Sequence, residues 1–172
     1  MPSSQPFRLM THNPQWPQEF QQARSSILQA TAGWLAEVEH IGGTAVPGAL
    51  SRPVVDMLAG INDLQALQEV CNLIEGLNYC RVETPAWCDD ELCGMLLKPR
   101  IGEATHSVLV VRHEQELWQR AIRTRERLNS DSAALEHLSQ IKQEHYHASC
   151  SAERDMEQAK EIFFGSLLDG PS

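Results

Sequence analysis

The sequence has no long hydrophobic run and little positive charge. No apolar stretch approaches the roughly 18 residues that a membrane-spanning helix needs, so we expect no membrane partner. Lys and Arg number 14 against 23 Asp and Glu, which gives a formal net charge of -9. A broad cationic surface that neutralises many phosphates is therefore lacking, and we expect no general nucleic-acid binding.

The sequence also lacks several short signals. The beginning, MPSSQPFRLMTHNPQWPQEF, has no charged region followed by the apolar region of a signal peptide. The five cysteines include no C-x-x-C pair, and an odd number cannot be fully paired within one chain. Reduced thiols in a cytoplasmic protein fit this pattern best. Neither G-x-x-x-x-G-K-[ST] nor G-x-G-x-x-G occurs, which excludes the two best-known glycine motifs for nucleotides.

The length and apolar content indicate one domain over residues 1–172. A chain of 172 residues with 42% hydrophobic side chains can bury a substantial core, and it is too short for two domains. We expect a sheet-containing core over about 1–112 and a helical C-terminal part over about 113–172.

The spacing of apolar residues predicts the order helix, strand, strand, helix, three strands, three helices. The stretch RPVVDMLAGI is β-branched and nearly continuous in apolarity, which suits a strand buried on both faces. The layout is α+β, with a mixed β-sheet and helices mainly on one face. The expected helices are 15–32, 62–76, 114–128, 131–146 and 153–168, and the expected strands are 36–41, 52–61, 79–84, 93–99 and 106–112.

The stretch EHIGGTAVPGALSRPVVDM, residues 39–57, combines a double glycine with a carboxylate inside an apolar run. Gly42 and Gly43 let the backbone approach a ligand and point successive N–H groups at one anion. Thr44 adds a hydroxyl. Asp56 returns on the next strand, and Mg²⁺ commonly takes one or two carboxylates together with substrate phosphates. The pattern is typical of a minimal nucleotide site, although Gly-Gly and Val-Pro-Gly are also ordinary turn formers.

The segment VEHIGGTAVPGALSRPVVDML closely resembles the signature of the GrpB (UPF0157) family. The segments HNPQWPQEF, THSVLVV, TRERLNS, IKQEHY and EQAKEIF resemble other parts of that family, so the resemblance extends over most of the chain. It implies a nucleotidyltransferase-like fold, with an apolar residue, Gly, then Gly or Ser, and an Asp-x-[Asp/Glu] pair on a following strand. Fold is better supported by this resemblance than reaction is.

The sequence departs from that pattern in three places. Gly43 replaces the usual Ser, which removes a hydroxyl and leaves the backbone. Arg52 replaces the usual Lys, which keeps a cation and adds forked donors suited to phosphate. Leu58 stands where the second carboxylate is expected, on the same face as Asp56 by strand alternation. Two-metal transfer needs carboxylates that clamp two ions. Substitutes would have to come from Glu103 or from the acidic run 89–91.

The resemblance places further candidates in the second half of the chain. His106 matches the first histidine of a family strand, but Leu109 stands where a second is common. Arg125 falls where the family has Arg-Asp, and Lys142 matches a family lysine by alignment. A histidine that enters an apolar strand is also consistent with a purely structural role.

Three other groups of side chains are further candidates for a function. A basic helix face is either a clamp for substrate phosphate or carboxylate, or a solvated face paired with acidic neighbours. A histidine-rich helix tail is a weak candidate for a metal site. Two cysteines that flank the acidic run are a redox pair, ligands, or ordinary loop and strand thiols. The three groups are Arg120, Arg123 and Arg127; His137, His145, His147 and Cys150; and Cys88 and Cys93.

These observations give three hypotheses. In the first, the protein binds ATP or another nucleoside triphosphate with Mg²⁺ and transfers a nucleotidyl or phosphoryl group to a small molecule. Its binding residues are Gly42, Gly43, Thr44, Arg52 and Lys142, its metal ligand is Asp56, and its catalytic residues are Asp56, His106 and Arg125. In the second, a degenerate nucleotidyltransferase fold binds a ligand or partner without catalysis. In the third, a repurposed site acts on a small polar substrate without a nucleotide.

Overall fold

A computed structural model describes residues 9–84, 88 and 93–147. The elements follow the predicted order, and the helix predicted at 153–168 lies outside the described residues. They are α1 (Trp16–Thr31), β1 (Leu35–Ile41), β2 (Val55–Ile61), α2 (Leu67–Glu75), β3 (Cys80–Val82), β4 (Gly94–Lys98), β5 (His106–Arg112), α3 (Glu116–Ser130) and α4 (Ser132–His147). Short 3-10 turns, η1 (Gly43–Ala45) and η2 (Leu64–Ala66), precede β2 and α2.

Helix boundaries follow the signals in the sequence. Asn13 Oδ1 accepts a hydrogen bond from the backbone N–H of Gln15 at 2.9 Å, just before α1. Asp63 caps the 3-10 turn before α2 by accepting from the N–H of Gln65 at 2.9 Å. Gly76 ends α2. These polar and glycine residues satisfy or release the backbone at helix ends, which is why they mark boundaries reliably.

The five strands form one sheet in the order β1-β2-β5-β4-β3. Strands β2 and β5 are parallel, and the other three pairs are antiparallel. The predicted α+β class with a mixed sheet is confirmed. β2 lies between β1 and β5 in the sheet. Its side chains pack on both faces, with Met57 in one apolar cluster and Leu58 in another, as its apolar sequence predicted.

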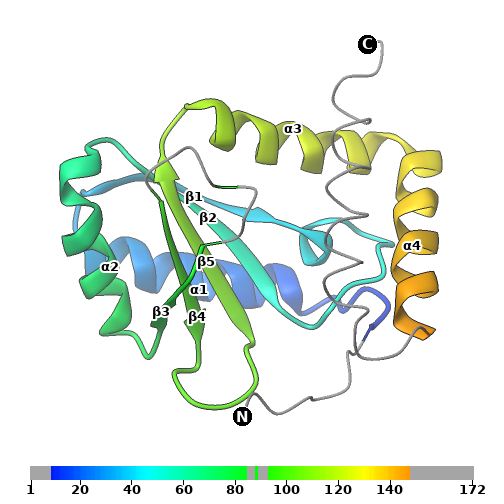
Figure 1. Cartoon of the computed structure of the whole chain (residues 1–172), viewed down its shortest axis with the longest axis horizontal. Helices are drawn as coiled ribbons and strands as arrows, with labels where there is room; N and C mark the ends of the chain where they lie inside the picture. Colours follow the sequence, from blue (N-terminus) through cyan, green and yellow to red (C-terminus); the bar gives the residue numbers. More distant parts are fainter. Residues whose placement is uncertain (1–8, 85–87, 89–92, 148–172) are drawn as a thin grey trace.

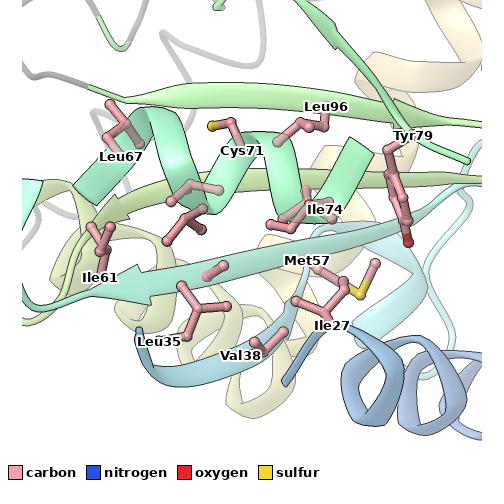
Figure 2. Close-up of a cluster of buried hydrophobic side chains, with 14 of the residues drawn as sticks. Ile27, Leu35, Val38, Met57, Ile61, Leu67, Cys71, Ile74, Tyr79 and Leu96 are labelled. Carbon is pink, nitrogen blue, oxygen red and sulfur yellow. The ribbon is translucent and has the colours of Figure 1, made fainter. Parts of the chain in front are cut away.

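One face of the sheet packs against α1 and α2. Figure 2 shows side chains of α2 and of the strands meeting in this layer, with Cys71 and Ile74 facing Leu96 and Met57. Residues at every second position of β2 point here, beginning with Val55 and ending with Ile61. This is the larger apolar core, and it holds none of residues 42–44.

The other face packs against α3. Leu58 and Leu109 contact Leu117 and Trp118 in a second apolar cluster. A Cβ atom added to Gly60 would stand 2.9 Å from Trp118 Cζ3, so the absence of a side chain at this position lets α3 approach the sheet backbone. Asp56 and Leu58 therefore share the α3 face, as strand alternation predicted.

A third, smaller cluster joins the helical C-terminal part to the stretch that follows the double glycine. Val46 and Ala49 pack against Leu128, Ala134 and Leu138. Figure 1 shows α4 standing beside this connecting segment, at the end of the sheet away from α2. The chain after residue 113 thus supports the turn from outside. Among the described residues, no helix has the length and apolarity to cross a membrane.

Candidate functional site

The double glycine begins a tight turn, residues 42–44, at the end of β1. Gly42 has φ 72° and ψ -172°, a backbone conformation that is essentially restricted to glycine. A Cβ atom at this residue would also lie 2.6 Å from Asp56 Oδ2. The backbone of the glycine turn therefore lies directly against the carboxylate of β2, and a side chain at Gly42 would separate them.

The second glycine faces a cation. A Cβ atom on Gly43 would stand 2.6 Å from Ser51 Oγ and 3.0 Å from Lys142 Nζ. Lys142 comes from α4, is 6% exposed and donates from Nζ to the carbonyl oxygen of Leu50 at 2.6 Å. An ammonium thus lies beside Gly43 while a carboxylate lies beside Gly42. Opposite charges on the two sides of one turn suit an anion that carries its own cation.

Thr44 braces the turn from inside. Its side chain is fully buried, and Oγ1 lies 2.8 Å from His40 Nε2. His40 stacks on Phe20 of α1, with ring centroids 4.8 Å apart. Burial and the nearby charges of Arg125 and His12 lower the pKa of His40 to about 4, so the ring is neutral at pH 7. The hydroxyl predicted to donate to a phosphate is instead bonded to a half-buried histidine.

Two successive cross-strand pairs on the α3 face have opposite chemistry. In the parallel register of β2 and β5, Asp56 pairs with Ser107 and Leu58 pairs with Leu109. Ser107 Oγ donates to Asp56 Oδ1 at 2.5 Å. We call Asp56 and Ser107 the polar row, and Leu58 and Leu109 the apolar row. Both leucines that depart from the family pattern are thus direct neighbours, and each fills the space beside the other.

The apolar row also explains the two nearby cysteines. Cys88 is buried with Leu58 and Leu109, and Cys93 packs against the same cluster. Both thiols lie in or against this apolar cluster, which favours the interpretation as ordinary thiols.

A divalent cation fits this site when a phosphate compound bound with it supplies most of the cation's coordinating oxygens. Among the described ranges, no group of three or more His, Cys, Asp or Glu side chains is placed to hold a metal. Asp56 contributes one carboxylate beside the glycine turn. Mg²⁺ is commonly bound through one or two carboxylates plus substrate phosphates and water, so the residues fit a cation that arrives with a phosphate. They do not fit a metal held by the protein alone.

Arg125 acts on the end of β1 rather than on Asp56. Its Nη1 donates to Glu39 Oε2 at 2.5 Å and to the carbonyl oxygen of His40 at 3.0 Å. Burial raises the pKa of Glu39, but hydrogen bonds from Arg125 and Glu37 outweigh it, and the net pKa is lowered. Glu39 is the cross-strand partner of Leu58, so this ion pair lies at the border of the apolar row.

His106 is not brought to the same place. Val108 and Val110 of β5 point to the α1 and α2 face, and alternation puts His106 there too, opposite to Ser107. His106 Nδ1 lies 2.9 Å from Thr105 Oγ1. Burial and the charge of Lys98 lower its pKa. The sheet therefore separates His106 from Asp56, although the two belong to adjacent strands.

The remaining candidates lie at the periphery. Arg52 is exposed in the segment between Ser51 and the start of β2, and Glu103 is exposed in the turn between β4 and β5. The acidic run 89–91 lies outside the described residues. His137 is exposed on α4. The side chains of His145 and His147, and all of Cys150, also lie outside the described part.

Two of the three arginines on the predicted basic face are paired with carboxylates. Arg123 Nη2 is 3.2 Å from Glu116 Oε1, and Arg127 Nη2 is 3.3 Å from Asp131 Oδ2. All four side chains reach solvent. These pairs favour the interpretation as a solvated helix face.

Sequence reasoning missed Ser51, Ser107, Glu39 and His40. His40 carried a local signal, because it stands four residues before Thr44 in the same turn motif. Ser51 lies within the quoted motif and its backbone bonds to Met10 in both directions, which fixes it beside Gly43. Ser107 and Glu39 depend on strand register, which the sequence does not reveal.

The family model described as GrpB protein matches residues 6–169 of the chain. Glutamate-rich protein GrpB of Alkalihalophilus pseudofirmus is 20% identical over 162 residues, which cover 94% of this chain and 93% of that protein. A UPF0157 protein of Halalkalibacterium halodurans is 28% identical over 87 residues, and the match spans 50% of this chain but 45% of the relative. The crystal structure of conserved protein GrpB from Enterococcus faecalis has a TM-score of 0.74 at 19% identity, covering 94% of this chain and 100% of that one, so the two share a fold.

Proposed function

The chain belongs to the GrpB family, and from the geometry of its glycine turn we propose that it binds a nucleoside triphosphate such as ATP together with Mg²⁺. The observation that carries this proposal is the pair of opposite charges against the double glycine. Asp56 Oδ2 lies against Gly42, and Lys142 Nζ lies against Gly43. A triphosphate with its cation is a ligand that uses both charges at once.

Each side of the turn has a separate task. The first N–H groups of a 3-10 turn have no hydrogen-bond partner within the turn. The backbone amides of Gly43 and Thr44 can therefore donate hydrogen bonds to phosphate oxygens. Lys142 supplies positive charge beside Gly43, and the exposed guanidinium of Arg52, next to Ser51, is a further candidate donor. Asp56 would ligate the cation through the oxygen that faces Gly42.

The apolar row supports binding rather than two-metal transfer. Leu58 and Leu109 are 0% and 3% exposed, and they occupy the cross-strand position next to Asp56. A second metal ion would need a carboxylate at this position, about 4 Å from the first ion. Two packed leucines offer neither a ligand nor room. The protein is therefore a ligand-binding member of a nucleotidyltransferase-like group, with a small-molecule nucleotide as its partner in the cytoplasm.

Transfer of a nucleotidyl or phosphoryl group to a small molecule is the second candidate. The observation in its favour is Glu39, a carboxylate that lies beside Leu58 in the register. Glu39 would have to exchange its ion pair with Arg125 for a metal. The alternative without a nucleotide, in which His106 and Arg125 handle one substrate, has less support because the two residues lie on opposite faces of the sheet.

Isothermal titration calorimetry with ATP, with and without Mg²⁺, tests the proposal. We expect wild type to bind ATP, and to bind it more tightly when Mg²⁺ is present. Asp56→Asn should lose this increase in affinity, whereas Lys142→Met should lose about tenfold in affinity with or without Mg²⁺. Lys98→Met, a lysine on the opposite face, serves as the matched control and should bind as wild type does. The proposal would be rejected if wild type does not bind ATP at millimolar concentration. It would also be rejected if Asp56→Asn and Lys142→Met both bind ATP as tightly as wild type does.

A turnover assay separates the two candidates. The binding function predicts no consumption of ATP by pure protein in the presence of Mg²⁺ and small-molecule acceptors. Consumption that disappears in Asp56→Asn and in Glu39→Gln, while both variants keep the wild-type melting temperature, would favour transfer.

A further inference from the structure

The strand register places Ser107 directly beside Asp56. It is the direct partner of Asp56 across the parallel pair of β2 and β5, and it is 3% exposed. Its Oγ donates to Asp56 Oδ1 at 2.5 Å. A hydrogen bond to an ionised acceptor contributes more to stability than a bond between neutral groups.

This bond gives the two oxygens of Asp56 different surroundings. Oδ1 faces Ser107, whereas Oδ2 lies 2.6 Å from the position that a Cβ atom on Gly42 would occupy. Rotation of the carboxylate that offered both oxygens to one cation at the glycine turn would break the bond from Ser107. The side chain is therefore set to present one oxygen to the turn.

We infer that Ser107 is a positioning residue that makes Asp56 a one-oxygen ligand and so favours Mg²⁺ over Ca²⁺ in the nucleotide complex. The inference rests on the proposed function. Mg²⁺ requires near-octahedral geometry at about 2.0–2.1 Å and takes single carboxylate oxygens, whereas Ca²⁺ accepts six to eight oxygens and often binds a carboxylate through both. Loss of the hydroxyl frees Asp56 to rotate, and the penalty against Ca²⁺ disappears.

Calorimetric titration with ATP in Mg²⁺ and, separately, in Ca²⁺ tests this role. Wild type should bind the Mg²⁺ complex more tightly than the Ca²⁺ complex. Ser107→Ala should lose about tenfold in affinity for the Mg²⁺ complex and less for the Ca²⁺ complex, so that the ratio of the two affinities falls. Ser107→Thr keeps the hydroxyl in a residue suited to a strand and should restore the ratio.

The matched control is Ser26→Ala, which removes an exposed hydroxyl bonded to Gln22 on α1, outside the site. It should leave the ratio unchanged. If Ser107→Ala keeps the wild-type ratio while Asp56→Asn loses the gain from Mg²⁺, the inference is overturned and the proposed function stands. If Ser107→Thr loses the ratio as fully as Ser107→Ala at unchanged melting temperature, the hydroxyl is not the cause and the inference is again overturned. If wild type binds neither complex, both are overturned.

Discussion

The polar row and the apolar row lie two residues apart on the same face of the same two strands, yet their side chains differ in chemistry and in what they contact. In the polar row, Asp56 accepts a hydrogen bond from Ser107 and lies against Gly42. In the apolar row, Leu58 and Leu109 fill a cluster with Trp118 of α3. The first row holds a carboxylate against the glycine turn, and the second contributes to the core.

The surroundings of Leu58 explain why a second carboxylate next to Asp56 would destabilise the fold. A second acidic residue at position 58 would lie among apolar side chains under α3, where an unpaired charge is costly. The paired leucines remove that cost and anchor the helix. Leucine at both positions therefore stabilises the packing of α3 on the sheet.

The largest effect should come from Leu58→Asp, which puts a charge into the apolar row. We expect a loss on the order of 3–5 kcal/mol in the free energy of unfolding, because a buried carboxylate lacks a partner there. Leu58→Met, of similar volume, should cost less than about 1.5 kcal/mol. Urea unfolding measures both. If Leu58→Asp is as stable as wild type and gains metal-dependent turnover, the apolar row is not a core element and the comparison fails.

A smaller effect should come from Gly42→Ala, which separates the polar row from its turn. The backbone conformation and the contact with Asp56 Oδ2 both oppose a Cβ atom, and we expect a cost of about 2–4 kcal/mol. Gly33→Ala is the matched control: Gly33 has φ 92° but nothing within 4 Å of an added Cβ atom, so backbone strain alone should cost about 1–2 kcal/mol. Equal losses in thermal unfolding would show that the contact with Asp56 is unimportant.

A pH titration sharpens the comparison further, because the turn beside the polar row is braced by a titratable residue. The pKa of His40 falls from 6.5 to about 4 on folding, so the unfolded chain takes up a proton that the folded chain does not. Stability from the neutral ring is complete above pH 6.5 and is lost as the pH falls towards about 4. His40→Gln should flatten this part of the curve. An unchanged slope between the two proteins would contradict the neutral, half-buried state of the His40 ring.

The smallest effect is expected outside both rows. Arg123→Ala removes an exposed ion pair with Glu116, and such pairs contribute about 0–1 kcal/mol. We expect wild-type affinity for ATP as well. A large loss of nucleotide affinity in this variant, measured by calorimetry, would instead favour a basic clamp on α3.

Much of the fold was predictable because its signals are local. Helix ends follow from Asn13, Asp63 and Gly76, and the strands follow from runs of β-branched residues. Period-two alternation was enough to place Leu58 on the face of Asp56. The start of α2 differs most from the prediction, because the 3-10 turn η2 occupies Leu64–Ala66 before the helix begins at Leu67. The ends of β2 and β3 differ by up to three residues, because strand ends depend on pairing partners, and both ends of α3 lie two residues later than predicted.

The site was less predictable because it depends on register and on contacts between distant segments. His106 and Ser107 are adjacent in sequence, but alignment of β5 with β2 sends Ser107 to Asp56 and His106 to the other face. Lys142 reaches Gly43 because α4 docks on Val46 and Ala49. Resemblance to the family suggested Lys142, and only the fold supplies the physical reason.

The most direct test of the single-carboxylate site is a crystal structure with a non-hydrolysable ATP analogue and Mg²⁺. We predict phosphate oxygens on the amides of the glycine turn and on Lys142, with one metal ion on Asp56 Oδ2 and the apolar row unchanged. A nucleotide bound elsewhere, or two metal ions clamped beside Asp56, would contradict the account.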